Sequence, residues 1–204
     1  MKTPGVYIQE KNAFSTTVVE AATAIPAFIG ITEKAVNGSE SLANKPWKIT
    51  SMTEFAQYFG GAPLPVCNLS VAEPAETDAD LLYCSAPVNG VSLKVAKPAN
   101  LFTLYYNMVM FFANGGGTCY IVSVGTYAEG NQIDKDKAGV ALDALKEVRE
   151  VTMVVVPEAV NVDGCKDIQQ LAIKHCGEMQ NRFAIFDVQP KASADEIMSA
   201  QIEK

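Results

Sequence analysis

The amino-acid sequence predicts an α/β protein with a mixed, largely parallel sheet and flanking helices, preceded by an extended N-terminal arm and carrying a small proline-rich β insertion. Residues 101–124 combine an apolar helical stretch, a glycine stop and a β-branched strand, which is typical of an α/β core. After them, apolar strands alternate with amphipathic helices over short links, a pattern that favours parallel pairing with right-handed crossovers. With 204 residues, 49% of them hydrophobic, the chain can bury a core in one domain.

Residues 1–20 are predicted to form an arm outside this core. A short β-prone run is followed by polar residues, and a second β-prone run covers residues 14–19. Short strands at a terminus need a sheet to join, either their own or a neighbour's. The arm is therefore expected to be disordered in isolation or paired with a neighbouring chain, and its exchanging residues are predicted to be Val6, Tyr7, Ile8, Gln9 and Glu10.

Residues 21–61 are predicted to begin the core. Residues 24–32, AIPAFIGIT, form the first strand, and Pro26 places it at a sheet edge or marks a strand start. Residues 33–48 are polar and predict a loop. The capping box at residues 51–54 then opens a helix that ends before Gly60, with Phe55 and Phe59 on its core face.

Residues 62–98 differ in composition and predict an inserted small subdomain or loop. Five of the ten prolines of the chain fall here, at Pro63, Pro65, Pro74, Pro87 and Pro98, and residues 73–80 form an acidic patch. Short strands are expected at residues 81–84 and 91–95.

Residues 99–204 are predicted to continue the α/β core. Residues 101–113 are apolar almost all round, which indicates a buried helix, and residues 118–124 indicate a buried strand. The periodicity then predicts, in order, a helix over 138–150, a buried strand over 151–156, a helix over 165–181, a buried strand over 183–188 and a helix from Ser193 to Lys204.

The charge balance argues against nucleic acid and membrane surfaces as partners. Sixteen basic and 23 acidic residues give a net charge of -7, and no basic stripe that would displace phosphate counterions is visible. The longest apolar run is too short to span a bilayer, and residues 1–12 lack the apolar stretch of a secretory signal. Five scattered cysteines suit reduced thiols rather than a disulfide framework.

The chain is interpreted first as a structural protein, and for this interpretation the sequence predicts no catalytic residue, cofactor or metal. The triple glycine at residues 115–117 follows a helix and leads into a strand, whereas phosphate loops follow a strand and open a helix. It is therefore predicted to be a structural turn. His175 and Cys176 are consecutive on a helix and point about 100° apart, so they form no preassembled dyad.

Two alternatives to a structural role remain open from the residues alone. Glu158, Asp163 and Asp187 follow predicted parallel strands, and carboxylates at such strand ends can bind a metal in an α/β enzyme. The loop before Gly164 lies between a strand and a helix, where a passive ligand-binding domain would place its pocket.

Six stretches of the chain resemble, in order, the tail sheath proteins of contractile phage tails, R-type bacteriocins and contractile injection systems. These stretches are PGVYIQE at 4–10, AIPAFIGIT at 24–32, EFAQYFGG at 54–61, FFANGGGTCYIVSV at 111–124, VVVP at 154–157 and RFAIFD at 182–187. The proline-rich region is not part of the resemblance.

The resemblance implies a non-enzymatic subunit that assembles helically with copies of itself around an inner tube and contracts to drive the tube through a target envelope. It also implies strand exchange by the arm, contacts to tube and baseplate, assembly in the bacterial cytoplasm, and a final place in a virion tail or injection particle. Family members continue past RFAIFD into a tube-facing domain and a C-terminal arm. The chain is therefore expected to be a truncated product or a divergent short relative, unable alone to form a contractile sheath.

Overall fold

The computed structural model of the chain describes residues 24–64, 69–72, 81–84, 92–96, 101–130 and 132–188. The predicted arm at residues 1–20 and the predicted helix from Ser193 lie outside these residues. The described part is a mixed α/β fold, and it confirms the fold class that the sequence predicts.

A five-stranded sheet forms the centre, in the order β10–β9–β1–β8–β4. Its strands are β1 (Pro26–Thr32), β4 (Trp47–Ile49), β8 (Cys119–Thr126), β9 (Met153–Val155) and β10 (Phe183–Ile185). The first, eighth, ninth and tenth strands pair in parallel, and β4 alone runs antiparallel, against β8. The sheet is therefore mixed and largely parallel.

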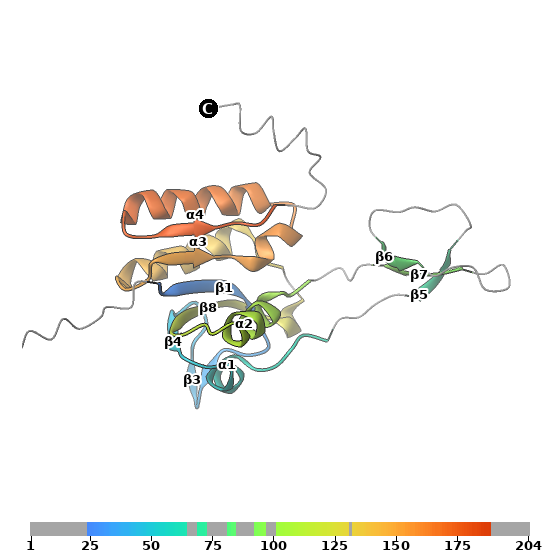
Figure 1. Ribbon diagram of the computed structural model, residues 1–204, viewed down its shortest axis with the longest axis horizontal. Helices are drawn as coiled ribbons and strands as arrows, with labels where there is room; N and C mark the ends of the chain where they lie inside the picture. The colour runs from blue at the N-terminus through green and yellow to red at the C-terminus, as the bar shows by residue number, and fades with distance from the viewer. Residues whose placement is uncertain are drawn as a thin grey trace, which may run out of the picture.

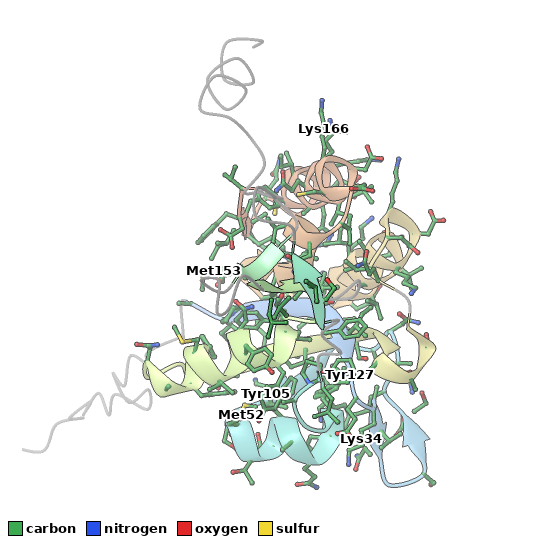
Figure 2. The ribbon with its side chains drawn as sticks, turned by 90° about the vertical axis from the view of Figure 1, so that its right-hand side faces the viewer. Lys34, Met52, Tyr105, Tyr127, Met153 and Lys166 are labelled. Carbon is green, nitrogen blue, oxygen red and sulfur yellow. The ribbon has the colours of Figure 1, made fainter. Side chains whose placement is uncertain are left out.

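Helices cover both faces of this sheet and make a three-layer molecule (Figure 1). Helices α1 (Met52–Phe59) and α2 (Leu104–Ala113) lie on one face. Helices α3 (Lys135–Ala144) and α4 (Cys165–Met179) lie on the other. In Figure 2, Lys166 of α4 and Met52 of α1 accordingly lie at opposite ends of the molecule, with Met153 of the sheet between them.

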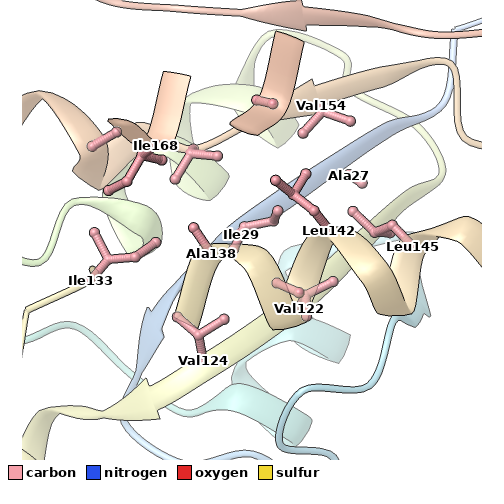
Figure 3. Packing of buried hydrophobic residues seen from close by; sticks show 14 of the residues in the cluster. Ala27, Ile29, Val122, Val124, Ile133, Ala138, Leu142, Leu145, Val154 and Ile168 are labelled. Carbon is pink, nitrogen blue, oxygen red and sulfur yellow. The ribbon is translucent and has the colours of Figure 1, made fainter. Parts of the chain in front are cut away.

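Strand β1 is buried along its whole length because both of its faces are covered. Ala27, Ile29 and Ile31 point to the layer of α3 and α4, whereas Phe28 points to the layer of α1 and α2. Figure 3 shows the first of these two cores, in which Leu142 of α3 and Ile168 of α4 belong to the same apolar cluster as Ile29. The continuous apolar run AIPAFIGIT thus reflects a strand between two helical layers.

The corner between α2 and β8 confirms the structural turn predicted at the triple glycine. Gly115 has a φ of +84°, a left-handed conformation that glycine adopts without steric cost. A Cβ on Gly116 would lie 2.6 Å from the backbone oxygen of Phe111, so this position has no room for a side chain. A Cβ on Gly117 would have no other atom within 4 Å.

Strands β5 (Leu69–Ala72), β6 (Leu81–Cys84) and β7 (Ser92–Ala96) form a separate antiparallel sheet in the order β5–β7–β6. Figure 1 draws it beside the three-layer core. The strands predicted at 81–84 and 91–95 are confirmed, with β7 beginning and ending one residue later than expected. Strand β5 was not predicted from the sequence.

The prediction of a loop over residues 33–48 is wrong in part. This region contains the hairpin of β2 (Val36–Asn37) and β3 (Glu40–Ser41), and β4 begins at its end. The strand β4 escapes a periodicity analysis because it is short and on the sheet edge, with Ile49 its only fully buried side chain. Pro26 is the first residue of β1, which confirms the strand-start alternative, although β1 itself is the central strand.

Candidate assembly surfaces

The residues predicted to exchange between subunits, Val6, Tyr7, Ile8, Gln9 and Glu10, lie outside the described residues, so their role stays a prediction. The described residues nevertheless contain two exposed apolar surfaces. One is the outer face of α2, and the other is the face of β10 that carries Phe183 and Ile185. Both lie on the same side of the sheet.

The outer face of α2 is apolar and solvent-exposed. Tyr106 is 49% exposed, Val109 39% and Met110 64%, whereas Leu104 and Met108 on the inner face are fully buried. The helix sequence, LYYNMVMFFA, contains no charged residue. An isolated apolar side chain on a surface is ordinary, but an exposed helix face without any charge is a feature of interaction surfaces.

This finding corrects the prediction of a helix buried on all sides over residues 101–113. The helix begins at Leu104, and it packs mainly against β1, α1 and the 3-10 helix η3 (Pro157–Asn161). The ring of Tyr106 contacts that of its neighbour Tyr105, with centroids 5.6 Å apart, but Tyr106 and Met110 are still 49% and 64% exposed. The apolar composition that indicated a second covering layer instead belongs to a surface that the described chain leaves open.

Two aromatic contacts and a buried carboxylate hold α2 in place. The ring of Tyr105 lies 6.0 Å from that of Phe55 in α1, and the ring of Phe111 lies 5.3 Å from that of Phe28 in β1. In Figure 2, Tyr105 of α2 lies on the side of that helix that faces α1. A helix anchored at both ends presents its outer face in a fixed orientation, as an interface requires.

Glu158 is the buried carboxylate, with 2% of its surface exposed. Its Oε1 accepts a hydrogen bond from the Leu104 backbone N–H at 3.3 Å, and its Oε2 accepts one from the Ile31 N–H at 3.0 Å. The carboxylate therefore joins the N-terminus of α2, the positive end of the helix dipole, to the central strand. Burial raises the pKa of Glu158 to about 7, although these backbone hydrogen bonds favour the ionised form.

The second surface is the face of β10 on the side of α1 and α2. Ala27, Val154 and Ala184 are paired across the sheet and point toward α3 and α4, so their neighbours in each strand point the other way. Phe183 is 57% exposed and Ile185 46% exposed on that other face. The prediction of a buried strand over 183–188 is therefore wrong, because β10 is a sheet-edge strand that is covered mainly on one face.

Arg182 joins the C-terminal ends of α3 and α4 instead of taking part in a site. It is 7% exposed and donates to the carbonyl of Leu145 at 3.0 Å and to that of Val148 at 2.9 Å. Its Nη1 also lies 3.2 Å from His175 Nε2. Burial, followed by the charge of Arg182, lowers the pKa of His175, so this histidine is neutral and accepts from the guanidinium.

The carboxylates of the metal-enzyme alternative do not form a metal site. Glu158 binds backbone N–H groups in the core, whereas Asp163 and Asp187 are exposed to solvent. Within the described ranges, no group of three histidine, cysteine or acidic side chains is arranged to hold a metal ion. The position of these residues after parallel strands was predicted correctly, but the inward turn of Glu158 was missed.

The ligand pocket beside Gly164 stays a prediction. Gly164 is the residue before α4, and it does not line the cavity described next. An open cavity of about 160 Å³ lies instead between α3 and α4, where Leu142, Lys146 and His175 contribute to its walls. The helices of the described part of the chain are all too short or too polar to cross a membrane.

The fold is similar to that of a solved contractile sheath. The cryo-EM structure of the helical sheath of the anti-feeding prophage in its contracted state matches 97% of this chain at 17% sequence identity, with a TM-score of 0.50. The match covers 42% of the sheath subunit, so this chain spans less than half of that protein's length. No protein-family model matches the chain, and no curated protein sequence is significantly similar to it. The chain therefore has a sheath-like fold.

Proposed function

We propose that this chain is a structural subunit, corresponding to the N-terminal part, of a contractile tail sheath. Such a sheath polymerises around an inner tube and contracts to drive it through a target envelope. The observation that carries the proposal is the sheath-like fold over nearly the whole chain. The six sheath-type sequence stretches are independent support, because they rest on the residues and not on the fold.

The proposed role is mechanical and not catalytic. Glu158 and His175, two of the side chains with shifted pKa values, each bind a structural partner and do not lie together in one cavity. A mechanical subunit needs a rigid body and several adhesive surfaces. The three-layer core supplies the former, and the uncharged outer face of α2 suits the latter.

The proposed partners are neighbouring copies of the same chain in a helical array. A heterologous contact that does not close on itself generates such an array. The outer face of α2, defined by Tyr106, Val109 and Met110, is assigned to one of these contacts, with a second copy as its occupant. The residues Val6, Tyr7, Ile8, Gln9 and Glu10 are assigned to strand addition onto a neighbour's sheet.

Contacts with the inner tube and the baseplate are assigned to the part of a full-length sheath subunit that the structural match does not include. The proposal places assembly in the bacterial cytoplasm and the finished polymer in a virion tail or an injection particle.

Electron microscopy of the complete gene product tests the proposal. We expect tubular or ring-shaped polymers of many copies, and we expect Met110→Glu to abolish them because a charge would enter an apolar contact. Val140→Glu is the matched control, since Val140 is also exposed, at 52%, but lies on α3 on the opposite side of the sheet. A product that stays monomeric at all concentrations would overturn the proposal.

A further inference from the structure

The cavity between α3 and α4 is an open groove on the side of the sheet opposite to α2 (Figure 1). Its volume is about 160 Å³, and its apolar walls are formed by Leu142 of α3 and Leu171 of α4. Its charged side chains are solvent-exposed and form the rim, at Asp143, Lys146, Lys174 and Glu178. The groove therefore combines apolar walls with a polar rim, and this combination suits an amphipathic side chain.

The charges at the rim compensate one another. Lys146 Nζ lies 2.9 Å from Asp143 Oδ1 and 2.9 Å from Glu178 Oε2. Lys174 Nζ lies 3.9 Å from Glu178 Oε1. Two lysines and two carboxylates leave no net charge for a charged partner to neutralise. The groove thus favours an uncharged occupant, since a charged one would be buried without a partner.

Gly139 of α3 keeps the groove open. A glycine inside a helix is destabilising relative to alanine, so its presence needs a reason. A Cβ at Gly139 would lie 4.0 Å from Leu171 Cδ1, which is ordinary van der Waals contact, so no clash with the described residues excludes a side chain there. A long side chain at this position would, however, fill the cavity that Gly139 lines. The missing side chain therefore leaves space for a group from outside the chain.

We propose that the ring of Tyr106 from a second copy of the chain occupies this groove, so that the outer face of α2 in one copy packs on α3 and α4 of the next. This inference rests on the proposed function and names the surface that the outer face of α2 contacts. A cavity of roughly 150 Å³ holds a benzene ring, so the groove has room for one aromatic side chain. The ring of Tyr106 suits the apolar walls, and its hydroxyl group suits the polar rim.

The two surfaces lie on opposite faces of one domain. Helix α2 packs on one side of the central sheet, and α3 and α4 pack on the other. A contact between different surfaces of two copies is heterologous, and each added copy leaves a free surface for the next one. A contact between two α2 faces would instead pair two copies and end there. The inferred contact therefore produces the open array that the proposed function requires.

Photo-cross-linking in the polymer formed by the complete gene product tests the contact. Benzoylphenylalanine replaces Tyr106, because it keeps an aromatic ring at this position, and mass spectrometry identifies the peptides that it captures. We expect the main cross-links to reach the residues of α3 and α4 that line the groove. Co-assembly of two isotopically different preparations separates cross-links between copies from those within one copy.

Gly139→Met is a variant that fills the groove from within. We expect it to prevent polymers, although its unfolding temperature should stay the same or rise by about 2–4 °C, because a helical glycine is removed. Gly177→Met on α4 is the matched control, since a Cβ there meets nothing within 4 Å and Gly177 does not line the cavity. It should be as stable and still assemble. Val140 does not line the cavity either, so Val140→Glu remains a control.

The possible outcomes separate this inference from the proposed function. Polymers in which position 106 is cross-linked to another α2, or to no part of α3 and α4, would overturn the inferred contact and leave the proposed function standing. Polymers formed by Gly139→Met would have the same meaning. An unmodified gene product that forms no polymer would overturn the proposed function and this inference with it.

Discussion

At the scale of single residues, Glu158 caps the N-terminus of α2 although it lies 54 residues away from Leu104 in the sequence. Its carboxylate lies at the start of α2 and binds the backbone N–H groups of Leu104 and Ile31. Gly30 makes room for it, since a Cβ at that position would lie 3.3 Å from Glu158 Cδ and 3.0 Å from Leu104. A glycine within an apolar strand is the sequence signal for such a close approach.

The buried carboxyl of Glu158 predicts a pH dependence of stability. Its pKa rises from an ordinary 4.5 to about 7 on folding. Between these values the unfolded chain is ionised while the folded chain holds the proton, so the free energy of unfolding falls as pH rises through this window. Glu158→Gln should lack this pH dependence. The difference in the free energy of unfolding between the two proteins should therefore change by up to about 3 kcal/mol across the window.

Urea unfolding at pH 4.5 and pH 7.5 measures this effect. Glu147→Gln, an exposed position on the 3-10 helix η2 (Leu145–Glu147), is the control and should follow the unmodified protein. Parallel stability profiles for the unmodified protein and Glu158→Gln would contradict the assignment.

Arg182 is the second residue with a structural assignment that can be tested. Replacement by Met keeps most of the side-chain stem but leaves the buried carbonyls of Leu145 and Val148 without their donor. We expect a loss of about 2–4 kcal/mol in the free energy of unfolding. Arg149→Met, at an exposed position, should change it by less than about 0.5 kcal/mol.

The same variant has a spectroscopic readout, because His175 is the only histidine of the chain. Removal of the neighbouring guanidinium takes away one of the two leading causes of its lowered pKa. An NMR titration should therefore show the pKa of His175 moving upward in Arg182→Met. An unchanged titration would argue against the contact between the two side chains.

At the scale of elements, the glycines of the corner between α2 and β8 differ in the space that they leave for a side chain. Gly116→Ala would force a Cβ against the backbone oxygen of Phe111, and we expect a cost of about 1–3 kcal/mol. Gly117→Ala meets nothing within 4 Å and should be neutral or stabilising by up to about 1 kcal/mol. Thermal melting of the two variants compares them, and equal losses would refute this account of the corner.

The elements that periodicity predicts best are those with two covered faces or a clear apolar stripe. Strands β1 and β8 and helices α1 and α4 fall where the apolar runs and caps indicate. The phenylalanine pair Phe55 and Phe59 is buried as expected, with ring centroids 5.5 Å apart. Local residue patterns suffice here because the same residues form the element and fill the core.

The errors share a different cause. An apolar pattern predicts that a surface is buried against other residues, but it does not indicate whether those residues belong to the same chain. Tyr106 and Met110 on α2, and Phe183 and Ile185 on β10, were predicted to be buried and are exposed among the described residues. The inward direction of Glu158 was missed because it depends on the N–H groups of Ile31 and Leu104, which are distant in the sequence and come close only in the fold.

At the scale of the whole molecule, the arm is predicted to connect subunits without stabilising its own domain. Deletion of residues 1–20 should leave the unfolding temperature of the chain within a few degrees, because terminal segments contribute little to a core they do not enter. The same deletion in the complete gene product should prevent polymers from forming. A marked fall in the unfolding temperature would show that the arm is part of the core and contradict its role in strand exchange.

The proposed function requires sheath subunits that contain this domain to assemble helically through surfaces that a single chain leaves open. Cryo-electron microscopy of the polymer formed by the complete gene product tests it most directly. We predict a tube in which the three-layer domain repeats and the outer face of α2, at Tyr106 and Met110, is covered by a neighbouring copy. A repeating array in which this face is open to solvent, or the absence of any polymer, would contradict the account.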